Sequence, residues 1–146
     1  MNRAFVVLTL ISSAVSTLPI AQQRNASLTE QKMCAEQAKK VFEEEKEAES
    51  ESVNHSILYV SHYDSRDNIC YVMTHVEWYQ SNESVGERYT LTDAFEKHKF
   101  ASYFGGNNNH QPRQPYCDVF VPGHPIKCSS LSEFLNLVDK NFNISF

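Results

Sequence analysis

Glycine is scarce in this sequence, and the glycine-based motifs of several enzyme classes are missing. Only four of the 146 residues are glycine. The adjacent pair Gly105-Gly106 lacks the lysine and the strand–helix context of a phosphate-binding loop. No Gly-x-Ser-x-Gly segment is present, so the sequence has no nucleophile elbow. These absences argue against nucleotide-binding and elbow-type hydrolase sites, and we expect no cofactor.

Basic residues are too few to make a nucleic-acid-binding surface. The chain has 13 Lys and Arg residues against 18 Asp and Glu residues, which gives a net charge of −5. This excess of negative charge repels a phosphate backbone, and no basic stripe in the sequence offsets it. We therefore expect no nucleic-acid partner.

Long apolar runs are restricted to the N-terminus, where the residue order is that of a secretory signal. Arg3 precedes an uncharged run from Ala4 to Ile11, and small residues follow it. This order predicts a signal peptide over residues 1–16, with cleavage after residue 21 as the alternative. The competing interpretation is an uncleaved anchor, but a spanning helix needs about 20 mostly apolar residues. We expect a secreted or periplasmic protein with no stable membrane span after cleavage.

The few cysteines all follow the predicted signal peptide and stand singly in the sequence. Zinc sites need clustered thiolates such as Cys-x-x-Cys, which are missing here. An even number of cysteines behind an export signal predicts two disulfides. Of the three pairings open to them, we predict Cys34–Cys70, which ties a helix to the sheet, and Cys117–Cys128, which closes a local excursion.

After a polar lead-in over residues 17–26, the sequence predicts one α+β domain over residues 27–146. Two Ser-x-x-Glu capping boxes begin at Ser27 and Ser130, and each precedes apolar residues at helical spacing. We expect an N-terminal helix and a C-terminal helix, over residues 28–47 and 131–141.

Between the helices, segments rich in Tyr, Val, Ile, Thr and Phe predict a four- to five-stranded antiparallel sheet. The expected strands cover residues 56–63, 69–79, 87–95, 99–104 and 117–121. Residues 105–116 are rich in Gly, Asn and Pro and predict a loop. A symmetric turn between the first two strands would pair Tyr63 with Ile69 and Val60 with Val72.

Five short segments, spread over the chain after the predicted lead-in, form a recognisable sequence pattern. The segments are 33–42 (MCAEQAKKVF), 68–72 (NICYV), 93–96 (DAFE), 101–103 (ASY) and 128–134 (CSSLSEF). They resemble segments of a group of small exported bacterial proteins of unknown function. The resemblance covers most of the predicted mature chain and implies export and a four-cysteine framework. It implies no activity.

One candidate metal site follows from the symmetric strand pairing. In that pairing His55 lies opposite Glu77, and His75 lies two residues away on the same face. Two imidazoles and a carboxylate can hold zinc and leave a position for water, as in a small hydrolase. The alternative is a solvated sheet face with ordinary polar side chains.

The same pairing places large side chains on one outer face of the sheet. Tyrosine and methionine are frequent at recognition surfaces. The alternative is that the helices pack there and the residues belong to the core. The residues are Tyr59, Tyr63, Tyr71, Met73 and Tyr79. This face and the predicted loop favour a non-enzymatic binding or accessory module for a protein or an envelope polymer, with the metal-binding protein or hydrolase as the second hypothesis.

Overall fold

The computed structural model describes residues 26–49, 54–81, 83–108, 111–112, 114–121 and 123–144. The predicted signal peptide and all of the lead-in except Ala26 lie outside the described residues. The elements are, in chain order, α1 (Leu28–Ala48), β1 (His55–Asp64), β2 (Ile69–Gln80), β3 (Glu83–Asp93), β4 (Lys99–Asn108), β5 (Gln111–Pro112), β6 (Tyr116–Val121), β7 (His124–Lys127) and α2 (Leu131–Phe142).

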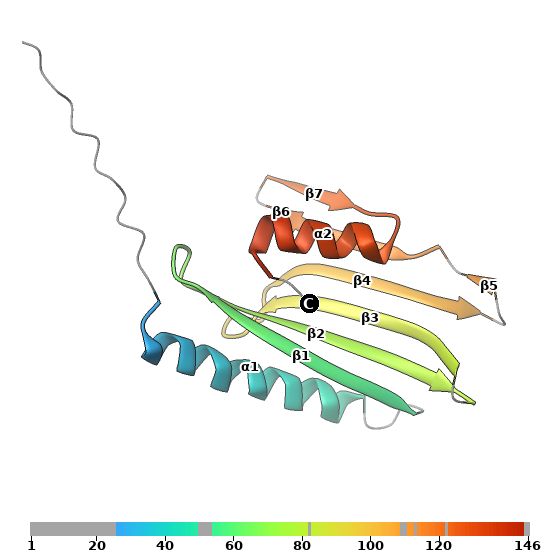
Figure 1. The fold of residues 1–146 in the computed structure, drawn as a ribbon, viewed down its shortest axis with the longest axis horizontal. Helices are drawn as coiled ribbons and strands as arrows, with labels where there is room; N and C mark the ends of the chain where they lie inside the picture. Colours follow the sequence, from blue (N-terminus) through green and yellow to red (C-terminus); the bar gives the residue numbers. More distant parts are fainter. Residues whose placement is uncertain are drawn as a thin grey trace, which may run out of the picture.

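The strands form one antiparallel sheet in the order β1-β2-β3-β4-β6-β7, and β5 pairs with β4. The two helices lie on opposite faces of this sheet (Figure 1). α1 packs on β1 and β2, whereas α2 packs on β4 and β6. We call the two sides the α1 face and the α2 face. The predicted α+β class, with one helix before and one helix after the strands of an antiparallel sheet, is confirmed, although the described sheet has more strands than the four or five predicted.

Both helices begin at the predicted serines. Ser27 accepts a hydrogen bond from the Glu30 N–H, and the Glu30 side chain accepts one from the Ser27 N–H, so the capping box is complete. Ser130 accepts a hydrogen bond from the Glu133 N–H in the same way. α2 ends at Asn143, whose left-handed conformation (φ 54°) is a common helix terminator.

The larger core lies between α2 and the sheet. Its buried residues alternate along the strands with residues of the α1 face, as the two-residue period of a strand requires. They include Tyr71, Met73, Leu91, Ala101 and Val119 from the sheet and Phe134, Val138 and Phe142 from α2. A smaller cluster under α1 contains Cys34, Ala38, Cys70, Val72 and Ala94.

The predicted register of β1 and β2 is wrong by one residue. Asp64 pairs with Ile69, and Val60 pairs with Met73. The cause lies in the turn, where the Asp64 carboxylate accepts a hydrogen bond from the Arg66 N–H (2.8 Å) and Asn68 takes a positive φ of 57°. Because side chains alternate between faces, this shift places every β1 side chain on the face opposite to the predicted one, relative to β2.

The predicted loop over residues 105–116 is wrong in part, because β4 continues to Asn108 and residues 111–112 form β5. Gly105 and Gly106 pair with Glu87 and Gly86 of β3. A Cβ atom on Gly105 would lie 2.6 Å from the Tyr103 hydroxyl oxygen. Glycine is therefore needed here for close packing within a strand. Strand β7 was not predicted and follows directly after β6.

Both predicted disulfides are present. Cys34–Cys70 joins α1 to β2 with a Cα–Cα distance of 5.4 Å. Cys117–Cys128 joins β6 to the segment before α2 with a Cα–Cα distance of 5.2 Å. Each helix is thus linked covalently, directly or through its preceding segment, to the face that it covers.

Candidate functional site

The structure separates the residues of the predicted metal site. His55 pairs with Trp78 on the α1 face, whereas His75 and Glu77 lie on the α2 face. The register shift described above is the reason, since it reverses the face of His55. Within the part of the chain that the structure describes, no group of three or more His, Cys, Asp or Glu side chains is placed to hold a metal ion.

His75 instead belongs to a cluster of aromatic and acidic side chains at one end of the sheet. Its ring stacks on Tyr89 with 4.1 Å between centroids, and its Nε2 lies 3.6 Å from a Glu87 oxygen. Tyr79 donates a hydrogen bond to Glu77 (2.7 Å), which lowers the pKa of that carboxyl. Burial raises the pKa of Tyr89 to about 12, so its hydroxyl stays protonated at neutral pH. These contacts stabilise the end of the sheet.

The residues predicted for partner binding do not share an outer face. Tyr71 and Met73 are 4% and 0% exposed in the core under α2. Tyr59 lies under α1 and stacks on Phe42 with 4.7 Å between ring centroids. Tyr63 packs on the same small cluster, and Tyr79 is half-buried. Most of this set therefore packs beneath the two helices.

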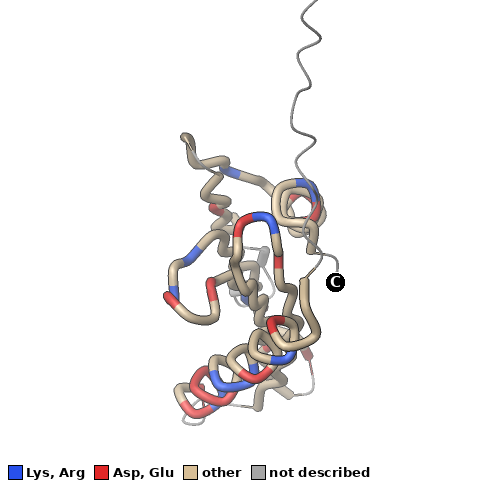
Figure 2. Tube along the Cα trace, turned by 90° about the vertical axis from the view of Figure 1, so that its left-hand side faces the viewer, with Lys and Arg blue, Asp and Glu red and all other residues tan. Residues whose placement is uncertain are grey.

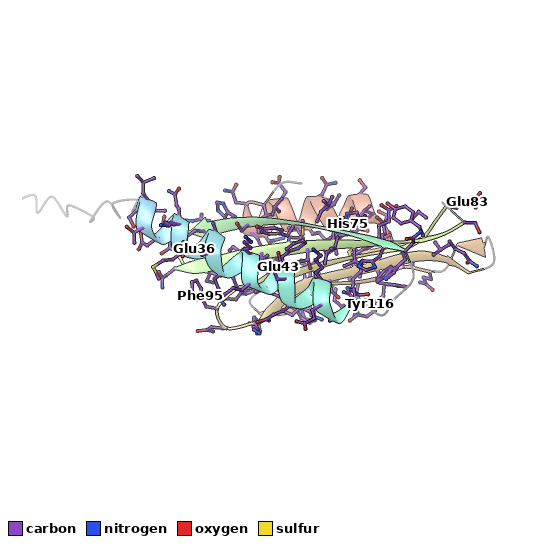
Figure 3. The ribbon with its side chains drawn as sticks, turned by 90° about the horizontal axis from the view of Figure 1, so that it is seen from below. Glu36, Glu43, His75, Glu83, Phe95 and Tyr116 are labelled. Atoms are coloured by element: carbon purple, nitrogen blue, oxygen red, sulfur yellow. A yellow bond between two sulfur atoms is a disulfide. The ribbon has the colours of Figure 1, made fainter. Side chains whose placement is uncertain are left out.

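Two exposed apolar side chains lie together elsewhere, between the N-terminal half of α1 and the β3–β4 turn. Met33 of α1 is 52% exposed and Phe95 of the turn is 51% exposed. They line a groove of about 270 Å³, and Phe95 lies beside the N-terminal half of α1 in Figure 3. We call this the α1–turn groove; its lining residues are Glu30, Met33, Tyr63, Asn68, Asp93, Phe95 and Glu96.

The two apolar side chains are held by a backbone that is fixed around Cys70. Met33 directly precedes Cys34, whose disulfide to Cys70 joins α1 to β2. Phe95 directly follows Ala94, whose N–H donates to the Cys70 carbonyl oxygen at 2.7 Å. Both walls of the groove are therefore anchored to a single residue of β2.

Polar contacts fix the turn that carries Phe95. The buried Asp93 carboxylate accepts hydrogen bonds from the N–H groups of Phe95 (2.8 Å) and Glu96 (3.2 Å). Gln37 of α1 donates to the Ala94 carbonyl oxygen at 3.1 Å, and Lys97 pairs with Glu44 of α1 at 2.6 Å. The side chains that line the groove are thus presented without the ordering cost of a free loop.

The groove combines an apolar surface with negative charge. Its lining includes the three carboxylates of Glu30, Asp93 and Glu96 and no lysine or arginine. The carboxylate of Glu30 is oriented by the capping box at 2.8 Å from the Ser27 N–H. An apolar floor with an acidic rim suits a side chain that has an aliphatic or aromatic body and a positive charge. The residues that line the groove include no nucleophile–base pair.

Met33 and Phe95 are not among the predicted site residues, although the sequence around each is unusual. Met33 lies beside the apolar stripe that Cys34 and Ala38 define, on the polar side of the predicted helix. Phe95 is a large aromatic residue in a turn between charged residues. Only the folded structure shows that the two residues are neighbours, and exposed apolar side chains that lie together can mark an interaction site.

Comparisons with protein-family models, with curated protein sequences and with solved structures find no match. The resemblance to exported bacterial proteins therefore stays an expectation. The four cysteines of the framework that it implies form two disulfides. Neither α1 nor α2, the helices of the described residues, has the length and apolar character needed to cross a membrane.

Proposed function

We propose that this protein is an exported binding module that recognises a protein partner through the α1–turn groove and catalyses no reaction. The observation that carries the proposal is the exposure of Met33 and Phe95 on a backbone fixed by a disulfide and by buried hydrogen bonds. A monomeric protein gains no stability from holding such side chains in water, but a binding surface uses them.

Export is supported by two independent features. The N-terminal sequence has the residue order of a secretory signal. The four cysteines form two disulfides, and such bonds persist in oxidising compartments such as the periplasm or the extracellular space. The mature protein would meet its partner there.

The chemistry of the groove limits the partner segment. The carboxylates of Glu30 and Glu96, together with the buried Asp93, disfavour an acidic segment and favour a lysine or arginine. The aliphatic stem of such a residue can pack against Phe95 and Met33 while its charge meets Glu30 or Glu96. We therefore expect the bound segment to be basic and apolar.

Affinity capture with matched variants tests this proposal. Mature, oxidised protein is incubated with the envelope fraction and medium of its own cells, and the recovered proteins are identified by mass spectrometry. The wild type should recover a stoichiometric partner. Met33→Ser with Phe95→Ser should weaken the affinity by about tenfold or more, because exposed apolar anchors dominate such interfaces.

The control is a second pair of exposed apolar residues outside the groove. Leu28 and Phe120 are 85% and 41% exposed, so Leu28→Ser with Phe120→Ser removes a similar apolar surface. This variant should retain the partner. Equal capture by both variants, or no stoichiometric partner for the wild type, would contradict the proposal.

A further inference from the structure

The two edges of the sheet differ in how they are protected from pairing with another strand. The β7 edge has only four residues and contains Pro125 and Lys127. A short length, proline and lysine are all devices by which proteins block strand addition. The β1 edge has ten residues, contains no Pro, Lys or Arg, and pairs with β2 without a bulge. Within the part of the chain that the structure describes, strand β1 therefore has the features of an open edge.

The hydrogen bonding of β1 shows which of its peptide groups face outward. The Tyr79 N–H donates to the Asn54 carbonyl oxygen at 2.8 Å, and this pair continues the register of β1 and β2. Bonding groups alternate along an antiparallel pair. The peptide groups of Ile57, Tyr59 and Ser61 consequently point away from β2, toward the place of a further strand.

One flank of α1 faces the β3–β4 turn, and the other flank faces the edge of the sheet formed by β1. On the first flank, Gln37 bonds to Ala94 and Glu44 pairs with Lys97, both in the β3–β4 turn. On the second flank, Phe42 stacks on Tyr59 of β1. Helical periodicity places three exposed lysines on this second flank, seven residues or about 10 Å apart. They are Lys32, Lys39 and Lys46.

These lysines are available to a partner. Lys32 has an intrahelical neighbour, Glu36, at 3.8 Å, but the two side chains are 77% and 64% exposed. Such exposed pairs contribute little and exchange readily. Figure 2 shows that basic and acidic residues are both present along α1. Glu30 and Glu44 belong to the flank that faces the turn, whereas helical periodicity places Glu36 and Glu43 next to the lysines, on the outer side of the helix away from β1.

The opposite side of the β1 edge is apolar. Leu58 is 59% exposed on the α2 face, although α2 itself covers β4 and β6. Val60, two residues further along the same face, is partly buried against the core under α2. A strand placed beside β1 would therefore meet lysines on one face and aliphatic side chains on the other.

We propose that β1 accepts an extended segment of a partner protein in which acidic and apolar residues alternate. Main-chain hydrogen bonds to the outward groups of Ile57, Tyr59 and Ser61 would add the segment to the sheet. Its acidic side chains would face the lysine flank of α1, and its apolar side chains would cover Leu58 and Val60. This site goes beyond the α1–turn groove, because it lies on the opposite flank of α1 and selects the opposite charge.

Titration of the mature, oxidised, full-length domain with synthetic peptides tests the site. The probe is a seven-residue peptide of alternating Val and Glu, and the control is the same peptide with Lys in place of Glu. Only the acidic peptide should bind. Binding should slow hydrogen exchange of the amides of Ile57, Tyr59 and Ser61, whereas the amide of Val60 already bonds to β2 and should not change.

Two sets of variants separate charge from strand addition. Lys32→Gln, Lys39→Gln and Lys46→Gln together should weaken acidic-peptide binding by about five- to tenfold at low salt. The matched triple variant Lys40→Gln, Lys99→Gln and Lys127→Gln changes the net charge equally away from this edge and should bind normally. Ser61→Pro, which removes one outward N–H, should abolish binding, whereas Ser61→Ala should not.

Three other outcomes would contradict the proposal that β1 accepts an acidic segment of a partner. Equal binding of the lysine peptide would exclude the charge selection, and protection confined to other strands would exclude addition to β1. If sedimentation shows a dimer in which the outward amides of β1 are protected without peptide, the edge is occupied by a second copy. None of these measurements involves Met33 or Phe95, so they do not bear on the groove.

Discussion

The two helices of this protein are attached to the sheet in different ways. α2, with 12 residues, buries Phe134, Val138 and Phe142 in the larger core. α1, with 21 residues, buries only Cys34 and Ala38. Its attachment depends on the Cys34–Cys70 disulfide and on polar contacts to the β3–β4 turn and to β3. The longer helix thus has the smaller apolar anchor.

This difference explains where binding surfaces can lie. A helix that is held by apolar burial must turn its apolar residues toward the core, as α2 does. A helix that is held by a covalent bond can leave apolar and charged residues on its flanks for other uses. α1 therefore exposes Met33 on one flank and Lys39 on the other, and both proposed sites lie beside it.

Removal of the disulfides should produce the largest losses of stability and should show most clearly that the two helices are attached differently. Cys34 and Cys70 are 36 residues apart, and Cys117 and Cys128 are 11 residues apart. Without a disulfide, the unfolded chain gains conformational entropy. We therefore expect the free energy of unfolding to fall by about 4 kcal/mol for the first Cys→Ser pair and by about 3 kcal/mol for the second. Urea unfolding followed by circular dichroism measures both losses.

The same variants separate stability from binding. Below the unfolding transition, Cys34→Ser with Cys70→Ser should also lose the partner of the α1–turn groove, because Met33 and Phe95 are no longer held together. Cys117→Ser with Cys128→Ser should keep that partner. A larger stability loss for the second pair, or retention of the partner by the first, would reverse the comparison between the helices.

Truncation of one valine on each helix tests the contrast in apolar anchoring. Val138 of α2 is completely buried, whereas Val41 of α1 is only partly buried. We expect Val138→Ala to lower the free energy of unfolding by about 2–3 kcal/mol and Val41→Ala by about 1 kcal/mol. Denaturant midpoints of the two oxidised variants provide the measurement. Equal losses would mean that α1 is anchored by burial after all.

Most of the fold could be predicted from the sequence because the relevant signals are local. The capping boxes at Ser27 and Ser130 mark both helix starts, and four isolated cysteines leave few pairings. The register of β1 and β2 depended on one side chain, Asp64, which bonds to the turn and moves the pairing by one residue. A composition-based turn rule does not contain that bond.

The candidate site was harder to predict for a physical reason. Tyr71 and Met73 have the composition of a recognition surface, but burial under α2 depends on which face the helix covers. The groove forms where α1 meets the β3–β4 turn, about sixty residues later in the sequence, so no short segment contains it. Gly105 and Gly106 misled in the same way, because their close packing against Tyr103 and Val85 appears only in the folded sheet.

The tip of the β1–β2 hairpin lines one cavity together with Ala26 before α1 and the C-terminal end of α2, and it should give a pH-dependent effect on stability. The Arg66 guanidinium lowers the pKa of Asp64 from 3.8 to about 2 through a side-chain hydrogen bond. A lowered pKa stabilises the folded state above about pH 4, and this contribution is lost as the pH falls toward 2. Arg66 is 62% exposed, so we expect only about 1 kcal/mol.

Thermal unfolding between pH 2 and pH 6 measures this contribution. Asp64→Asn should reduce the stability above pH 4 and flatten its decline in acid, while its amide oxygen can still accept the Arg66 N–H. Asp67→Asn is the control, because Asp67 lies in the same turn and should leave the acid dependence unchanged. If the decline persists in Asp64→Asn, another carboxylate is responsible for it.

The helix caps should give the smallest effects and the finest test of the comparison. Ser27 and Ser130 make the same bond, each accepting from the N–H three residues later at 3.2 Å. The first turn of α1 contains Leu28, which is 85% exposed, whereas α2 reaches the fully buried Phe134 within its first turn. Fraying of α1 therefore exposes little apolar surface, and fraying of α2 exposes a core residue.

We expect the free energy of unfolding, measured with urea, to fall by about 0.5 kcal/mol for Ser27→Ala and by about 1 kcal/mol for Ser130→Ala. A larger loss for Ser27→Ala would show that the capping box contributes to the attachment of α1 beyond its own turn, through the Glu30 carboxylate that lines the groove.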